Sequence, residues 1–255
     1  MIIFVAGMPR AGSMWTYNVV RAIFEARNYS VLPTLIPVDE MDLIQDALAS
    51  EEKAQEVYCI KTHLPLKIHA HTRHGIKIIC NMRDVRDACL SIMRFMHADY
   101  EVGISAMINM MQVTDYYLST FTDNLLAVRF EEVNESPRTV LESIGNFIGI
   151  ELSESEKQDI LGEFDKANVQ KKLRAMSNIR FDMDGRVINP ELRSGFDSIR
   201  NFDGTFRVYD KTTAFQSNHI TSDRDGEWRT SFDRRQIEQI NELSRDWLLR
   251  HGYRI

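Results

Sequence analysis

The stretch MIIFVAGMPRAGSMW, residues 1–15, decides the fold of this chain. Its first six residues are apolar, and a short apolar run that ends in glycine is typical of a buried parallel strand. The next residues include two glycines, a proline and Arg10, a composition typical of a turn. Residues 13–28 then carry apolar side chains at helical spacing. The sequence therefore predicts a strand, a tight turn and a helix in direct succession.

This turn is expected to bind an anion. A helix that follows a turn directly begins with backbone N–H groups that have no helical partner, and these donors attract phosphate or sulfate together with the helix dipole. The spacing from Gly7 to Gly12 resembles the nucleotide loop G-x-x-x-x-G-K-[ST], but the lysine is missing and Arg10 lies inside the loop instead. No expected strand ends in an evident Mg²⁺-binding aspartate. The loop therefore fits an anion but not the usual Mg·ATP arrangement; a turn whose glycines serve only backbone geometry is the alternative.

Composition excludes several classes of protein. The chain has 255 residues, 44% hydrophobic residues and a net charge of −6, which is typical of a globular protein and argues against general nucleic-acid binding. No segment approaches the run of about 20 apolar residues that crosses a bilayer, and the N-terminal run is too short for a signal peptide. The three cysteines, Cys59, Cys80 and Cys89, show no metal-binding spacing and are interpreted as reduced core residues. A cytoplasmic protein without nucleic-acid or membrane partners is therefore expected.

Strands alternate with helices along the rest of the chain, which predicts an α/β fold in one domain, residues 1–255. We expect a P-loop-like, three-layer fold with a central parallel sheet flanked by helices. Further strands are expected at EVYCIKTH (56–63), IKIICNMR (76–83) and NLLAVRFEEV (124–133), and further helices at 84–97, 136–150, 153–164 and 234–252.

Local signals place several helix ends. Ser136 precedes Pro137 as a plausible N-cap, and Ser153 stands three residues before Glu156 in a capping-box pattern. The last helix is expected to begin after Asp233, with an apolar stripe of Ile237, Ile240, Leu243 and Trp247. Residues 174–231 show no clear period and are interpreted as a lid or acceptor-binding loop region.

Three blocks, PRAGSMW (9–15), IKTHLPL (60–66) and NMRDVRDACLSIMRF (81–95), occur in this order. Together they resemble the sulfotransferases that use 3′-phosphoadenosine 5′-phosphosulfate (PAPS), of the cytosolic and bacterial small-molecule type. The resemblance implies in-line transfer of a sulfuryl group to a hydroxyl or amine, with 3′,5′-adenosine bisphosphate (PAP) as product and no metal required. A natural product of secondary metabolism is the expected acceptor.

The resemblance also implies roles for individual residues. The first block implies that the donor is gripped by the run Arg10, Ala11, Gly12, Ser13, Met14 and Trp15, with Trp15 against adenine or, alternatively, in the core. The third block implies that Arg83 and Ser91 bind the 3′-phosphate; an ion pair with a neighbouring aspartate and a helix-surface serine are the alternatives. Arg10 replaces the lysine of the cytosolic enzymes and is expected to act electrostatically, because its high pKa disfavours proton donation.

The middle block carries the expected catalytic pair. Lys61 and His63 lie two residues apart at a strand end, so their side chains share a face if the strand continues. His63 is expected to be the general base, since imidazole titrates near neutral pH. Lys61 is expected to stabilise the leaving oxygen. A structural histidine and a solvated lysine are the alternatives.

The sequence departs from the family pattern near its end. The segment GEWRTSF (226–232) is present, but Thr221, Ser222 and Asp223 stand where the family carries R-K-G. Arg224, Arg229 or His219 is therefore expected to complete the 3′-phosphate site, with a solvated loop arginine as the alternative for Arg224. Phe130 replaces a tyrosine that contacts the donor in the family.

The acceptor side is expected to involve residues 97–120 and 174–217, with Met96, Asp99 and Tyr116 as candidate contacts. Acidic residues collect in these segments, and a polar or cationic small molecule is favoured if they face the pocket. The methionines at helical spacing are alternatively core residues.

Two other functions remain open at this point. A P-loop kinase for nucleosides or small metabolites would require Mg·ATP, and a non-catalytic protein would bind the donor without turnover. A homodimer is one possible assembly, because the sequence sets no oligomeric state.

Overall fold

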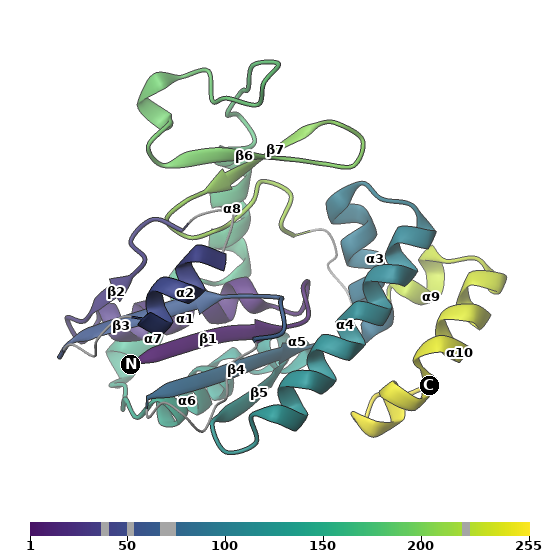
Figure 1. Ribbon diagram of the computed structural model, residues 1–255, viewed down its shortest axis with the longest axis horizontal. Coiled ribbons are helices and arrows are strands. Elements are labelled where there is room, and N and C mark those ends of the chain that lie inside the picture. The colour runs from purple at the N-terminus through teal and green to yellow at the C-terminus, as the bar shows by residue number, and fades with distance from the viewer. Residues whose placement is uncertain (37–40, 50–53, 67–74, 221–224) are drawn as a thin grey trace.

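The computed structural model describes residues 1–36, 41–49, 54–66, 75–220 and 225–255. Its centre is a sheet of five parallel strands in the order β2-β3-β1-β4-β5 (Figure 1). The strands are β1 (Ile2–Gly7), β2 (Ser30–Leu32), β3 (Glu56–Lys61), β4 (Ile76–Met82) and β5 (Leu125–Arg129). Apolar runs that are buried on both faces form such sheets, so the predicted α/β architecture is confirmed.

Helices cover both faces of the sheet and make three layers. Because side chains alternate along a strand, Ile3 and Val5 of β1 face one cluster, whereas Ile2 and Phe4 face the other. The first cluster includes residues of α1 (Ser13–Glu25), α6 (Pro137–Ile148), α7 (Glu154–Glu163) and α8 (Lys166–Met176). The second includes residues of α2 (Met41–Ala49) and α4 (Tyr100–Thr120).

A third cluster continues the structure past the end of the sheet. It joins α3 (Val85–Met96) and α4 to α9 (Trp228–Ser231) and α10 (Arg234–Arg250). Trp228 and Trp247 are buried in it, as are Met107 and Met110 of α4. These methionines are thus core residues, the alternative that helical spacing favoured. None of the described helices is long and apolar enough to cross a bilayer.

Several predicted helix ends are confirmed and three details differ. Ser153 with Glu156, and Asp233 with Gln236, form capping boxes. Ser136 holds the N-cap position of α6, but its side chain makes no cap hydrogen bond. The expected strand at 124–133 ends at Arg129, and Phe130–Glu135 forms helix α5, because acidic residues in a first turn favour a helix start. In α10, Leu243 is 43% exposed and Ser244 is buried instead, so the predicted stripe was wrong at that turn.

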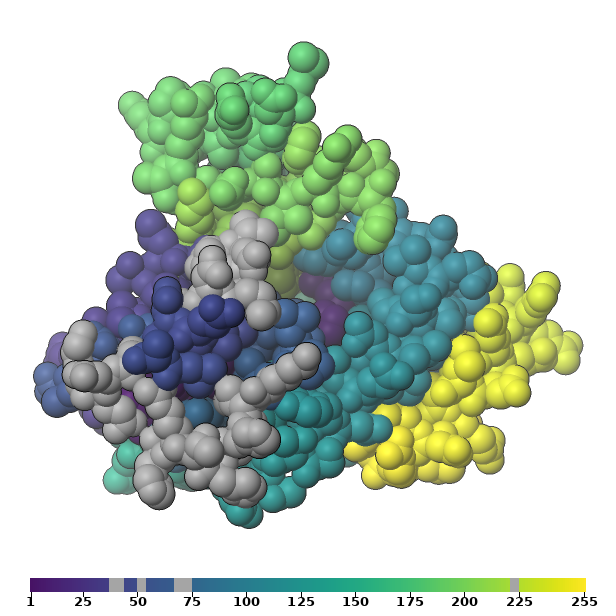
Figure 2. Space-filling model, viewed as in Figure 1, coloured from purple at the N-terminus to yellow at the C-terminus, as the bar shows by residue number. Residues whose placement is uncertain are grey.

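Residues 174–231 contain more regular structure than their sequence indicated. A short helix, η2 (Pro190–Leu192), precedes an antiparallel hairpin of β6 (Phe196–Arg200) and β7 (Phe206–Asp210), which lies above the end of α3 (Figure 1). The hairpin turn contacts α3, since Phe202 donates its N–H to the Met96 carbonyl at 3.2 Å and His97 pairs with Asp203. Figure 2 shows a hollow between this hairpin and the helices α3 and α4, with N-terminal residues at its floor.

The topology places a crevice at the carboxyl end of β1. Strands β3 and β4 flank β1, so the connections that leave β1 and its neighbours run to opposite sides of the sheet. Ligands of open α/β sheets bind at such a switch point. The turn of residues 8–12 begins there.

Candidate active site

The turn between β1 and α1 has a backbone that few side chains tolerate. Gly7, Arg10 and Gly12 have φ angles of 99°, 66° and 80°. A Cβ atom on Gly7 would lie 2.4 Å from the carbonyl oxygen of Asn81, so the ends of β1 and β4 meet closely. Gly12 is the N-cap of α1 and supplies no side-chain cap. The first turn of α1 therefore presents its N–H groups without a capping side chain, as an anion site requires.

Arg10 connects this turn to two distant segments. Its Nε donates to Ser91 Oγ at 3.0 Å, and its Nη2 donates to the carbonyl of His219. The guanidinium also lies 4.2 Å from the centroid of the Phe95 ring. Burial and the positive charges of Arg83 and Arg207 lower the pKa of Arg10 to about 9. Crowding of cations makes the site electropositive, and a bound anion would relieve the repulsion.

Arg83 lies on the other side of the turn and is 3% exposed. Its Nη1 is 3.5 Å from the Arg10 carbonyl, its Nη2 is 3.5 Å from Asp225 Oδ1, and its carbon Cζ is 4.0 Å from the centroid of Phe130. The buried Nε has no hydrogen-bond partner among the described residues. A buried N–H donor without a partner is costly, so this Nε is available to an oxygen acceptor.

Lys61 and His63 lie at the end of β3, as their spacing predicted. Lys61 Nζ is 3.3 Å from His63 Nε2, and His63 Nδ1 is 3.0 Å from the carbonyl of Gly7. Since a carbonyl accepts, we assign the ring proton to Nδ1, which leaves the Nε2 lone pair as the basic position. Burial, followed by the charge of Lys61, lowers the pKa of His63 to about 3. At neutral pH the imidazole is therefore neutral, with Nε2 as its unprotonated nitrogen and Lys61 Nζ beside it.

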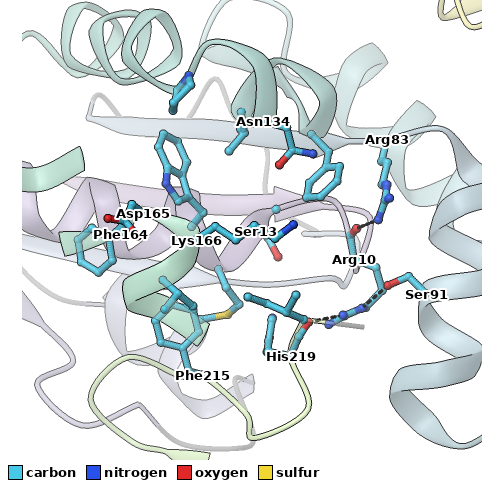
Figure 3. Close-up of a pocket in the computed structure, with 18 of the residues that line it drawn as sticks. Arg10, Ser13, Arg83, Ser91, Asn134, Phe164, Asp165, Lys166, Phe215 and His219 are labelled. Carbon is cyan, nitrogen blue, oxygen red and sulfur yellow. Dashed lines mark hydrogen bonds between the residues drawn. The ribbon is translucent and has the colours of Figure 1, made fainter. Parts of the chain in front are cut away.

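A cavity of about 340 Å³ extends from the arginines along α1 (Figure 3). Arg10, Arg83 and Ser91 lie at one end, and Phe164 and Lys166 lie at the other. The lining residues are Arg10, Gly12, Ser13, Met14, Trp15, Arg83, Ser91, Phe130, Val133, Asn134, Pro137, Leu161, Phe164, Asp165, Lys166, Val169, Phe215, His219, Ile220 and Asp225. The arginine end is thus cationic, and the rest of the lining combines apolar and aromatic side chains with Asp165 and Lys166, which fits a molecule that carries anionic groups on an aromatic body.

Other residues expected at the donor site lie differently. Ala11 is buried in the cluster behind the turn and does not line the cavity. Arg229 is exposed, lies 4.5 Å from the Trp228 ring and does not line the cavity. Arg224 and the three residues before it lie outside the described residues. The cavity therefore draws its described cations from Arg10, Arg83 and Lys166.

The three expected acceptor contacts are distributed over separate environments. Met96 lies beside the hairpin, where its sulfur is 3.5 Å from Arg207 Nη2. Asp99 is exposed and caps α4 by accepting from the Val102 N–H. Tyr116 packs beside the core under the sheet and donates to the Leu66 carbonyl. The contact of Met96 is with Arg207, whose charge acts on Arg10, so Met96 is the one of the three that these contacts connect to the arginines of the site.

Arg207 is a buried cation near Arg10 that the sequence analysis did not single out. It is 5% exposed, its Nε and Nη1 donate to Gln216 and Asn201, and its guanidinium lies 4.5 Å from the Phe95 ring. Burial lowers its pKa to about 10. The alternating pattern of FRVYD (206–210) is the one signal for this strand, and it stands in a segment without other periodicity.

Comparisons with known proteins agree on the kind of domain. A family model described as "Sulfotransferase domain" matches residues 2–195. A search of curated proteins found no match.

Solved structures match nearly the whole chain. A retinol dehydratase in complex with androsterone and the inactive cofactor PAP has a TM-score of 0.62 at 16% identity, over 97% of this chain and 80% of that one. The same enzyme in complex with retinol and PAP has a TM-score of 0.60 at 17% identity, over 97% of this chain and 81% of that one. Mouse sulfotransferase SULT7A1 in complex with PAP has a TM-score of 0.60 at 15% identity, over 97% of this chain and 83% of that one. At these identities the likeness shows the shared fold.

Proposed function

Because this chain belongs to the sulfotransferase family, we propose that it transfers the sulfuryl group of PAPS to a hydroxyl or amine of a small molecule. The products are the sulfated acceptor, PAP and the proton that the acceptor loses. One observation carries the proposal: Arg10, His63 and Arg83 come from three separate blocks and meet around one turn.

The cavity fits this donor in charge and in shape. The donor carries phosphates and a sulfonate on an adenosine. The unpartnered Arg83 Nε and the repulsion among the arginines call for anionic oxygens at the cationic end. Trp15 and Phe164 line the cavity and offer aromatic faces to a base. Three similar structures are complexes with PAP, which supports the same donor here.

PAPS, when bound, supplies an activated sulfonate whose bond to the bridging oxygen breaks as the acceptor attacks. Arg10 and Lys61 then place positive charge where that oxygen becomes negative. His63 Nε2 takes the acceptor proton, because the Gly7 carbonyl holds the ring proton on Nδ1. The backbone N–H groups of the turn orient the sulfonate and phosphate.

We propose a polar small molecule as the acceptor, entering by the hollow below the hairpin (Figure 2). Three of the acidic side chains in the segments expected on the acceptor side already have partners. Asp99 caps α4, Asp115 pairs with Arg250 and His251, and Asp182 accepts from N–H groups of its own turn. The geometry therefore favours a neutral or anionic polar acceptor over a cationic one.

Calorimetric titration with PAP, and with ATP in the presence and absence of Mg²⁺, tests the proposal. We expect PAP to bind without Mg²⁺ and more tightly than ATP. Binding of Mg·ATP alone would reject the proposal in favour of a kinase. A panel of phenols, alcohols and amines with radiolabelled PAPS then tests transfer, and PAP binding without transfer to any of them would favour a non-catalytic protein.

A further inference from the structure

Arg83, the residue proposed to bind the 3′-phosphate, already has an anionic partner. Its Nη2 lies 3.5 Å from Asp225 Oδ1, and both side chains line the cavity. Arg83 is 3% exposed, whereas the Asp225 side chain is 40% exposed. The carboxylate is therefore the more exposed partner of a pair whose guanidinium is buried, and both groups face the cavity.

The structure holds Asp225 in this position through its neighbours in the chain. Asp87 accepts hydrogen bonds from the N–H of Gly226 at 2.6 Å and the N–H of Trp228 at 3.2 Å. Asp87 is itself 3% exposed, so it fixes the backbone next to Asp225 from inside the protein. The carboxylate of Asp225, in contrast, contacts the Arg83 guanidinium, and among the described residues no backbone N–H donates to it.

We propose that Asp225 is a specificity-determining residue, an internal carboxylate that competes with the 3′-phosphate of the donor for Arg83. This inference rests on the proposed function, which assigns that phosphate to Arg83. A phosphate bound to Arg83 and the carboxylate of Asp225 would both be negative beside one guanidinium, so the two groups repel each other. The phosphate therefore binds only as Asp225 turns toward solvent. Displacing Asp225 from Arg83 costs free energy, and this cost lowers the affinity for every 3′-phosphorylated nucleotide.

The consequence is a weakened preference for 3′-phosphorylated nucleotides. Asp87 and Glu131 also place negative charge near Arg83, but both are held by backbone N–H groups. Among the acidic groups that the structure describes around Arg83, Asp225 thus differs in having no backbone N–H bonded to its carboxylate. Its removal should affect nucleotides with a 3′-phosphate and spare those without one.

Calorimetry on the Asp225→Asn variant tests this, with PAP and 5′-AMP as probes. Asparagine keeps the shape of the side chain and removes its charge. We expect PAP to bind at least fivefold more tightly than to the wild type, with 5′-AMP affinity unchanged within twofold. Glu227→Gln is the matched control, because Glu227 lies two residues away and pairs with Arg94 instead; it should leave both affinities unchanged.

Equal or weaker PAP binding by Asp225→Asn would overturn the inference. Melting temperatures with and without PAP separate a change in PAP binding from a change in the stability of the free protein. The variant should melt at a lower temperature than the wild type without ligand and gain more from PAP. Failure of the wild type to bind PAP would instead reject the proposed function, so the two failures are distinguishable.

Discussion

Arg10 and Arg207 lie over the same aromatic ring, at 4.2 and 4.5 Å from the centroid of Phe95. Arg10 comes from the first turn of the chain and Arg207 from the hairpin. The hydrogen bonds of Arg207 go to the neutral groups of Gln216, Asn201 and Met96. Phe95 therefore holds two cations near the turn, which makes this part of the site electropositive.

Removal of this second cation should weaken donor binding. We expect Arg207→Met to bind PAP about three- to tenfold less tightly at low salt, because a nearby positive charge is lost. The affinity should also fall less steeply as salt is raised, since fewer charges remain to be screened. Calorimetry at two salt concentrations checks both effects. Arg234→Met on the exposed side of α10 is the control; an equal loss in that variant would contradict the local explanation.

Loss of the proposed base should affect turnover and spare binding. We expect His63→Gln to lower kcat by about 10²- to 10⁴-fold, the usual contribution of general base catalysis. PAP affinity should stay within a few fold, because His63 contacts the turn and does not line the donor cavity. Initial rates with radiolabelled PAPS and the best acceptor of the panel measure the effect. Unchanged turnover would remove His63 from the mechanism.

The low pKa of His63 should also appear in the stability of the protein. Its folded-state pKa is lowered to about 3, whereas an unfolded histidine titrates near 6.5. Between these values the unfolded chain binds a proton that the folded chain does not, so the free energy of unfolding decreases as pH falls from 7 toward 3. We expect His63→Gln to lose less stability than the wild type between pH 7 and 5. Urea unfolding at both pH values measures the difference, and parallel losses would contradict it.

Two glycine substitutions should have opposite effects on stability. Gly7→Ala should lower the free energy of unfolding by about 2–5 kcal/mol, because it adds a Cβ at positive φ and against the Asn81 carbonyl. Gly162→Ala in α7, where a Cβ meets nothing within 4 Å, should raise it by about 0.5–1 kcal/mol. Urea unfolding of both variants tests the pair. A mild loss at Gly7 would mean that the two strand ends separate easily.

Much of the sheet and of the turn was predictable because their signals are local. The apolar runs of β1, β3 and β4, the glycines of the turn and the capping boxes of α7 and α10 each depend on residues close in sequence. The hairpin of residues 196–210 was not predicted, since its strands are short and its buried hydrophobic residues, Val208 and Tyr209, join a core cluster built from distant segments. Leu243 was misplaced for a related reason: which face of α10 is buried depends on where α3 and α4 lie against it.

By itself, the sequence predicted the strand, turn and helix at the start of the chain, the α/β fold, and Arg10, Lys61, His63 and Arg83 as candidate site residues. Only the tertiary structure decided that Arg207 joins them and that Asp225, rather than Arg229, faces Arg83. The physical reason is that long-range electrostatic contacts depend on side chains brought together from distant segments. Local periodicity says which face of an element is apolar, but it carries no information about the partner on the other side.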